Sequence, residues 1–570
     1  MMSYRAVLLC LVTLTLPSAL AKPPGVPPGP PFDPPGPPET PPGLAKQTVR
    51  FTVLHTNDHH GRFWRNGDGE LGMAARKTLI DRITAEVEAE GGEVLLLSGG
   101  DINTGVPESD LQDAEPDFVG MNLLGYDAMA VGNHEFDNPR DVLAAQEALA
   151  QFPFLSANIY DADSGDRIFA PYQLFDVNDL SIAVVGFTTA DTGKLANPDY
   201  VAGLEFRDPR DVAATLLPMI EQEHDPDLIF AVTHMGHYAN GANGSNAPGD
   251  VALAESLPAG LLDMIVGGHS QNPVCVRDDG SGEYADFGPG DPCLPDNKNG
   301  TWIVQAFEWG KYVGRADFAY RKGRLTLESY ALIPVNLKDD EGNVIVEPIE
   351  EDAEVLAVLQ PYQDAGDEAL GRVIAQSDGR LEGDRDVVRS QQTNLGRLIA
   401  TAQNEVVQGA GFGIMNSGGV RASIEAGEVT YRDVLTVQPF GNTVAQATLS
   451  GDELLEYLGE VASKQIGSGA YAQFAGISME VDCQAMSVSI SAIGGVDFDP
   501  SGEYVFSIPS FNAAGGDNYP VLEVIDTGFV DAQILAEFME ELGTIQVADF
   551  EPMGEIQYLN SLSDTGCQLE

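Results

Sequence analysis

The chain has 570 residues, of which 43% are hydrophobic, and it carries a formal net charge of −57. This length and composition are typical of a globular protein with two domains of ordinary size. The acidic charge excludes nucleic acid and anionic membrane surfaces as general partners, because like charges repel. Any anionic ligand must therefore be held by local cations.

The first 21 residues are predicted to be a secretory signal peptide. Arg5, the apolar run from Ala6 to Leu16 and Ala19-Leu20-Ala21 supply its charged, hydrophobic and small-residue parts. The apolar run is too short to span a bilayer, so we expect no stable membrane insertion. Residues 22–48 are rich in Pro and predict a semi-rigid, extended linker.

Five apolar runs, each followed by a polar loop, carry the candidate functional residues. The runs are Phe51–Leu54, Val94–Leu97, Ala128–Val131, Leu228–Val232 and Asp263–Val266. Open α/β sheets place their sites in the loops that follow buried strands. Between about residues 50 and 337 such runs alternate with helix-like stretches, for example 72–89, 139–151 and 210–223, which predicts an α/β domain.

The loops after these runs contain a mixed set of oxygen and imidazole ligands. The set is Asp58, His60, Asp101, Asn133, His234, His269 and Gln271. Without thiolate, it suits Zn, Mn, Co or Fe at a hydrolytic site better than a structural zinc site. Seven ligands exceed what one tetrahedral ion needs, so the sequence predicts two ions that share one carboxylate, for which we choose Asp101. A lone His after a strand is usually an ordinary loop residue, but all eight histidines lie between His55 and His269.

Five motifs in these loops carry a resemblance to a known family. They are Thr56-Asn57-Asp58-His59-His60-Gly61, Gly99-Gly100-Asp101, Gly132-Asn133-His134-Glu135-Phe136-Asp137, Thr233-His234-Met235-Gly236-His237 and Gly267-Gly268-His269-Ser270-Gln271. Over about residues 50–558 the chain resembles the calcineurin-like metallophosphoesterases and, among these, the 5′-nucleotidase family. The resemblance implies a two-sheet α/β metallophosphoesterase domain at 49–346. A connecting helix at 347–370 and a C-terminal α/β nucleotide-binding domain at 371–570 would follow.

The resemblance also implies an activity. Members of the 5′-nucleotidase family hydrolyse nucleoside 5′-phosphates to nucleoside and phosphate. Periplasmic bacterial members also hydrolyse UDP-sugars to uridine, sugar 1-phosphate and phosphate, and these reactions serve nucleotide salvage. Water activated by two divalent ions attacks without a covalent intermediate; we expect Zn, with Mn or Co able to support activity. We therefore expect an exported, periplasmic monomer that binds nucleotides and UDP-sugars.

Two other interpretations stay open. The first is a sister activity on 2′,3′-cyclic nucleotides and 3′-nucleotides, although the motif that ends at Asp137 and the long match over residues 95–138 favour the 5′-nucleotidase activity. The second is a non-catalytic metal-binding or nucleotide-binding protein that has kept the fold. A missing ligand would support it, and none is missing.

His134 and Asp137 are the candidate catalytic residues. His134 follows the proposed ligand Asn133, and its imidazolium could stabilise negative charge that develops during reaction. Asp137 lies three residues further on and could bind the other ring nitrogen and raise the pKa of His134. This dyad is similar to that of the family.

The second domain contains no His, so it cannot supply imidazole ligands. On composition alone its arginines would be surface charges and its phenylalanines core residues. The resemblance instead implies that guanidinium groups bind the substrate, that two Phe rings sandwich the base, that an amide binds the base edge and that a carboxylate binds the ribose. These residues are Arg385, Arg389, Arg421, Phe440, Phe511, Asn442 and Asp517. At Asn518 the family pattern has Gly.

Four cysteines remain beside Cys10, which would leave with the signal peptide. Cys10 also leaves open a lipoprotein signal, although its place inside the apolar run disfavours that. An even number of cysteines in an exported chain predicts disulfides. The family has a bridge that matches Cys275 with Cys293, whereas a pairing of Cys483 with Cys567 has no support from the family. Metal ligation by these thiols is the competing interpretation.

Overall fold

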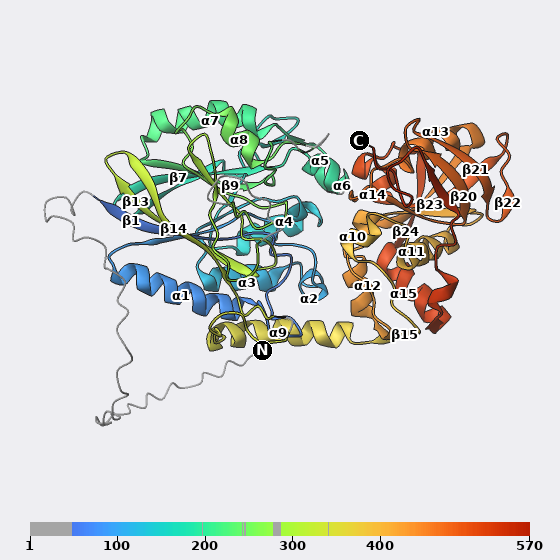
Figure 1. Ribbon diagram of the computed structural model, residues 1–570, viewed down its shortest axis with the longest axis horizontal. Helices are drawn as coiled ribbons and strands as arrows, with labels where there is room; N and C mark the ends of the chain where they lie inside the picture. Colours follow the sequence, from blue (N-terminus) through green and yellow to red (C-terminus); the bar gives the residue numbers. More distant parts are fainter. Residues whose placement is uncertain are drawn as a thin grey trace, which may run out of the picture. The chain divides into compact units, whose positions relative to one another are not determined.

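The computed structural model describes residues 48–196, 198–241, 243, 247–276, 287–339 and 341–569. The predicted signal peptide at 1–21, with Cys10, and all but the last residue of the predicted linker at 22–48 lie outside these residues. The described part of the chain contains no helix that is long and apolar enough to cross a membrane. Thr48–Glu570 forms one compact unit, which contains the two α/β domains shown in Figure 1.

Within the described residues, the first domain has two six-stranded sheets, each with a parallel centre, and a small two-stranded sheet of β5 (Ile159–Asp161) and β8 (Leu204–Phe206). Within the described residues, the first sheet consists of β1 (Val49–Thr56), β2 (Val94–Ser98), β3 (Ala128–Ala130), β4 (Phe154–Leu155), β13 (Tyr312–Arg321) and β14 (Arg324–Pro334). Their order is β14-β13-β1-β2-β3-β4. Strands β1 to β4 are parallel, and β13 and β14 pair antiparallel at one side. The carboxyl ends of β1, β2 and β3 therefore share one edge.

The second sheet repeats this plan. Within the described residues it consists of β6 (Tyr172–Val177), β7 (Leu180–Thr188), β9 (Leu228–His234), β10 (Met264–Val266), β11 (Asp296–Lys298) and β12 (Thr301–Val304). Their order is β11-β12-β10-β9-β7-β6, with β7, β9, β10 and β12 parallel. The sheets share one apolar core, in which the rings of Phe51 and Phe230 lie 6.2 Å apart. Both sets of strand ends thus carry their loops to one region.

Helices cover the outer faces of both sheets (Figure 1). On the first sheet lie α1 (Met73–Ala89), α3 (Glu115–Leu124) and α9 (Ala353–Leu370), and on the second lie α7 (Pro209–His224) and α8 (Asp250–Ser256). The smaller elements are α2 (Pro107–Asp110), α4 (Arg140–Leu149), α5 (Thr192–Leu195), α6 (Pro198–Val201), β5 (Ile159–Asp161) and β8 (Leu204–Phe206). This two-sheet arrangement confirms the predicted fold class.

The predicted elements agree with the structure except at their ends. The helices predicted at 72–89, 139–151 and 210–223 are α1, α4 and α7. The connecting helix, predicted from 347, begins only at Ala353, because the carboxylate of Asp352 accepts hydrogen bonds from the first free backbone N–H groups. The run predicted to end at Val232 continues to His234, which pairs with Thr188 of β7.

Within the part of the chain that the structure describes, the second domain is built from three smaller sheets. Within the described residues, the strand orders of these sheets are β19-β16-β23-β18-β24, β17-β15-β25 and β22-β21-β20-β26. The strands are β15 (Val373–Ser377), β16 (Phe412–Asn416), β17 (Gly427–Thr430), β18 (Thr443–Ser450), β19 (Ala472–Ala475), β20 (Ile477–Asp482), β21 (Ser487–Ile493), β22 (Val496–Asp497), β23 (Glu503–Pro509), β24 (Val524–Val530), β25 (Thr544–Ile545) and β26 (Ile556–Leu559). Its helices are α10 (Arg385–Val388), α11 (Asn394–Glu405), α12 (Tyr431–Val437), α13 (Gly451–Val461), α14 (Ser510–Ala513) and α15 (Asp531–Leu542). Two apolar cores hold these elements together.

Candidate active site

A cavity of about 690 Å³ is lined by loops of both domains. The first domain contributes loops after β2, β3, β7, β9 and β10, and the second contributes α10, α14 and the loops after β16, α12, α13 and α14. Of the proposed ligands Asp101, Asn133, His269 and Gln271 line it, whereas Asp58, His60 and His234 are buried behind them. This volume is within the usual range for small-molecule sites.

Left-handed backbone marks the loops that carry the proposed ligands. Asp58, His60, Asp101, His269 and Gln271 have φ values of 49°, 51°, 55°, 79° and 52°. Residues other than Gly adopt this conformation at an energetic cost that the surrounding structure must offset, and they cluster at functional sites. Five of the seven proposed ligands share this conformation, which supports a common role.

The buried histidines His60 and His234 each direct one ring nitrogen, Nε2, towards the carboxylates. His60 Nδ1 donates to the carbonyl of Thr104 at 2.8 Å, and His234 Nδ1 donates to that of Gly99 at 2.7 Å. A carbonyl only accepts, so Nδ1 carries a proton in both rings and Nε2 is the atom that could bind a metal, the arrangement usual for metal-binding histidines. His234 Nε2 has no hydrogen-bond partner among the described residues, although Asp101 Oδ2 lies 2.9 Å away.

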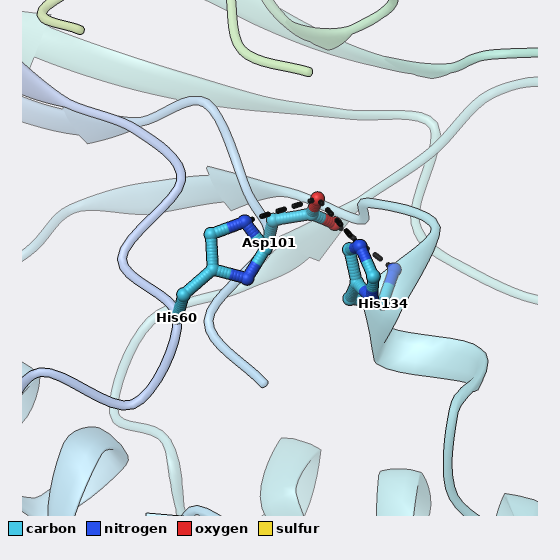
Figure 2. A group of neighbouring side chains, drawn as sticks. All are labelled: His60, Asp101 and His134. Carbon is cyan, nitrogen blue, oxygen red and sulfur yellow. Dashed lines mark hydrogen bonds and ion pairs between the residues drawn. The ribbon is translucent and has the colours of Figure 1, made fainter. Parts of the chain in front are cut away.

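Asp101 is the centre of two groupings that could hold metal ions. His60, Asp101 and His134 form one grouping, and Asp101, His234 and His269 form the other, each with its ligand atoms within 4.8 Å of one another. In Figure 2 His60 and His134 lie on either side of the Asp101 carboxylate, whose Oδ2 is 3.9 and 4.0 Å from their Nε2 atoms. A carboxylate common to both groupings is what a bridging ligand requires.

The electrostatics of the site also fit cations. Burial and, to a lesser extent, the neighbouring Asp101 raise the pKa of Asp58 to about 7 against the opposing effect of His234. Burial alone would lower the pKa of His234, but Asp101 and Asp58 outweigh burial and raise this pKa to about 10. The two buried carboxylates thus stabilise positive charge strongly. The donor set therefore fits divalent metal ions.

The two amide side chains of the proposed set contact its other members. Asn133 Oδ1 accepts from His269 Nδ1 at 2.8 Å. The Gln271 amide nitrogen lies 2.8 Å from His60 Nε2, and its oxygen accepts from Arg385 Nη1 at 2.8 Å. Arg385 of the second domain therefore reaches the ligand loops of the first.

His134 and Asp137 form the predicted pair. His134 Nδ1 and Asp137 Oδ2 are 2.5 Å apart. Burial opposes charge on His134, but Asp137 and Asp101 outweigh it and raise the pKa of His134 above its ordinary value. The raised pKa favours the imidazolium form, with its Nε2–H directed towards Asp101.

The three proposed substrate-binding arginines line the same cavity. Burial and the adjacent guanidinium groups lower the pKa of Arg389 to about 9. Burial and the charge of Arg385 lower the pKa of Arg421 to about 10. Arginines that repel one another at the end of a cavity create a site for an anion, such as phosphate.

The aromatic and polar candidates complete the cavity wall. Phe440 stacks on His134 with ring centroids 5.9 Å apart, and Arg421 lies 5.4 Å from its centre. Phe511, Asn442 and Asp517 also line the cavity. Asn518, where the family pattern has Gly, has a φ of 57°. Asn tolerates left-handed backbone better than most residues, so it is compatible with this position.

Two residues of the ligand motifs, Glu135 and Asn57, have structural roles that the sequence did not predict. The Glu135 carboxylate accepts from the backbone N–H groups of Ile102 at 2.7 Å and Gly132 at 2.6 Å, and so joins the loops after β2 and β3. Asn57 Nδ2 donates to Asp58 Oδ2 at 2.7 Å. The sequence signal for these roles is that Glu135 and Asn57 both lie inside the ligand motifs. Asp191, Lys194 and Tyr238 also line the cavity and lay outside every motif.

Disulfides join Cys275 to Cys293 and Cys483 to Cys567. Their sulfur atoms are therefore not free to bind metal, and that interpretation of the four cysteines is wrong.

Comparisons with known proteins identify the family to which the chain belongs. Residues 51–273 match the calcineurin-like phosphoesterase family, and residues 373–524 match the 5′-nucleotidase C-terminal domain. A 5′-nucleotidase of Vibrio cholerae serotype O1 is 57% identical over 525 residues, which cover 90% of this chain and 94% of that protein. The chain belongs to the 5′-nucleotidase family.

Other members of the 5′-nucleotidase family agree. Protein UshA of Escherichia coli is 53% identical over 90% of this chain and 94% of its own length. The crystal structure of a 5′-nucleotidase precursor from Thermus thermophilus aligns with a TM-score of 0.71 at 29% identity, over 90% of this chain and 100% of that one. The chain is thus an enzyme of a hydrolase family. Calcineurin-like phosphoesterases use a dinuclear metal site, for which the groupings around Asp101 are candidate ligands.

Proposed function

We propose that this enzyme hydrolyses nucleoside 5′-phosphates to nucleoside and phosphate, and UDP-sugars to uridine, sugar 1-phosphate and phosphate. One observation carries the proposal. A single cavity joins the carboxylate and imidazole groupings of the first domain to the arginines and aromatic rings of the second. A phosphate ester with an attached base is the ligand whose parts match both ends.

Two divalent ions, with Zn expected, would be held by Asp58, His60, Asp101, Asn133, His234, His269 and Gln271. When bound, such ions make a water molecule nucleophilic near neutral pH and polarise phosphoryl oxygens. Among the chain's own residues, Arg389 and Arg421 neutralise the substrate's anionic charge at the far wall. This local attraction offsets the repulsion of a chain with a net charge of −57.

His134 holds a proton where the reaction needs one. Asp137 accepts from Nδ1, and the raised pKa of His134 keeps Nε2 protonated as well. We expect this Nε2–H to stabilise the negative charge that develops on the phosphoryl and leaving oxygens. Phe440 stacks on the face of the imidazole.

The remaining predictions on organisation are part of the same proposal. Residues 1–21 would direct export to the periplasm, 22–48 would act as a linker, and the mature chain would act as a monomer in nucleotide salvage. The metallophosphoesterase domain would occupy 49–346, and 371–570 would bind the nucleoside. The residues between them would form the connection that contains α9.

Substrate profiling tests the proposed function. With added Co or Mn, the mature protein is expected to release phosphate from UMP, and uridine, sugar phosphate and phosphate from UDP-glucose. We expect 3′-UMP and 2′,3′-cyclic UMP to react at least about 100-fold more slowly, because their phosphate group would lie away from the hydrogen-bond donors that bind a 5′-phosphate. Preference for these two substrates would support the sister activity. Absence of hydrolysis with two bound metal equivalents would support a non-catalytic binding protein.

Replacement of Arg421 by Gln tests the substrate end of the cavity. Loss of a charge-assisted hydrogen bond to phosphate costs roughly 1.5–3 kcal/mol, so kcat/KM for UMP is expected to fall about 10- to 100-fold. Bound metal should not change. Arg372→Gln is the matched control, because Arg372 is an exposed arginine of the same domain that pairs with Glu540 at 3.0 Å. Equal kcat/KM values in the two variants would contradict the role of Arg421.

A further inference from the structure

The C-terminal tail, residues 560–569, lies against the wall of the cavity. It follows β26, which pairs with β20 as a parallel strand. The wall in question is the loop at residues 465–470, here called the pocket loop, of which residues 466–470 line the cavity. Ile466 N donates to the carbonyl of Cys567 at 2.9 Å. The tail and the pocket loop therefore form one structural unit.

Other contacts extend this unit to a proposed substrate-binding arginine. Gly467 N donates to the carbonyl of Arg389 at 2.8 Å. Thr565 Oγ1 donates to the carbonyl of Ser390, the next residue, at 2.7 Å. The backbone at Arg389 is thus supported from the pocket loop and from the tail at once.

The fit between tail and pocket loop is tight at Gly566. A Cβ atom there would lie 2.3 Å from Ile466 Cγ2 and 2.8 Å from the ring of Tyr471. The Tyr471 hydroxyl also donates to the carbonyl of Thr565 at 2.7 Å. A displacement of the tail by the size of a methyl group would therefore move Ile466, which lines the cavity.

Apart from these contacts, the tail has little apolar anchorage. Leu562 and Leu569 are 66% and 44% exposed, whereas Cys567 is fully buried. Cys567 is bonded to Cys483, which follows β20 and whose N–H donates to Leu559 at 3.0 Å. The disulfide thus fixes the tail to the sheet and spans 84 residues of sequence.

We propose that the Cys483–Cys567 disulfide is a positioning device for the substrate: it fixes the tail against the pocket loop and so holds Ile466 and Arg389 in place. Neither sulfur touches the cavity. The device acts on binding of the nucleotide and leaves the metal groupings of the first domain unaffected. The inference rests on the proposed function, because UMP is the probe.

The test compares holoenzymes by steady-state kinetics with UMP and by calorimetric binding of uridine, which is not hydrolysed. In Cys483→Ala/Cys567→Ala we expect KM for UMP and the Kd of uridine to rise about tenfold, as for the loss of one or two hydrogen bonds. The kcat and the metal content should stay within about twofold of the parent, a split that general destabilisation would not produce.

Two further variants guard against misfolding and against effects of disulfide loss in general. Gly566→Ala keeps the disulfide but displaces Ile466, and it should raise KM in the same direction. Cys275→Ala/Cys293→Ala removes the other disulfide, neither cysteine of which lines the cavity, and KM should not change.

The two hypotheses fail in different ways. A parent enzyme that does not hydrolyse UMP would refute the proposed function. A parent that does, with the KM for UMP unchanged in Gly566→Ala and in a folded Cys483→Ala/Cys567→Ala variant, would refute the positioning role. A KM that rises equally in both double-cysteine variants would refute it as well.

Discussion

Replacement of Asp101 by alanine is expected to abolish hydrolysis, with kcat/KM for UMP lower by on the order of 10³-fold or more, equivalent to about 4 kcal/mol of transition-state stabilisation. Asp101 belongs to both groupings that could hold metal, and its Oδ2 lies 2.9 Å from His234 Nε2. Its loss removes the one side chain common to the two groupings. Metal analysis of the same sample should show fewer than two equivalents.

Two companion variants separate charge from shape. Asp101→Asn keeps the volume of the side chain but not its charge, and it should lose nearly as much activity as the alanine variant. Asp263→Asn is the matched control, because Asp263 directly precedes β10, at the end opposite to His269, and caps Ile229 N at 3.0 Å. It should keep full activity. Unchanged hydrolysis in Asp101→Ala would remove the two-metal site from the mechanism.

Replacement of His134 by asparagine is expected to keep two metal equivalents but to lower kcat roughly 100- to 1,000-fold, the usual cost of losing one donor to developing negative charge. KM should change little, because the side chain acts mainly in the transition state. Steady-state kinetics on samples of verified metal content provide the measurement.

The structure also allows a different role for His134, and the same variant distinguishes the two. His134 Nε2 is 4.0 Å from Asp101 Oδ2 and belongs to one grouping that could hold metal. If His134 were a ligand, His134→Asn would lose one metal equivalent. His224→Asn is the control, because His224 ends α7 and contacts the Tyr172 hydroxyl at 2.8 Å. It should behave as the parent.

Most of the fold and the composition of the candidate site could be predicted from the sequence. Apolar runs followed by polar loops indicated strands of buried sheets, because a parallel strand without solvent contact has no polar positions of its own. The clustering of all histidines between His55 and His269 pointed to one site. Helix ends were less predictable, as at Asp352, because a cap depends on one side chain.

Only the tertiary structure could decide how these residues act together. The free Nε2 of His234 depends on the carbonyl of Gly99, which is 135 residues away in sequence. His59 lies between two proposed ligands in the sequence, but its ring nitrogens have other partners. Nδ1 is 3.0 Å from Arg76 Nη2, and Nε2 is 2.8 Å from Asp117 Oδ1. No local pattern distinguishes His59 from His60, because the difference lies in partners that the fold supplies.

The same distinction holds for the second domain and for the tail. By itself the sequence determined which candidate residues this domain offers: Arg385, Arg389 and Arg421, the rings of Phe440 and Phe511, and the cysteines Cys483 and Cys567. That Arg389 is supported by the pocket loop, and that Cys567 meets Cys483 behind that loop, was decided by packing. The physical reason is that hydrogen bonds and disulfides depend on distances in space, and only the folded chain brings segments distant in sequence within that range.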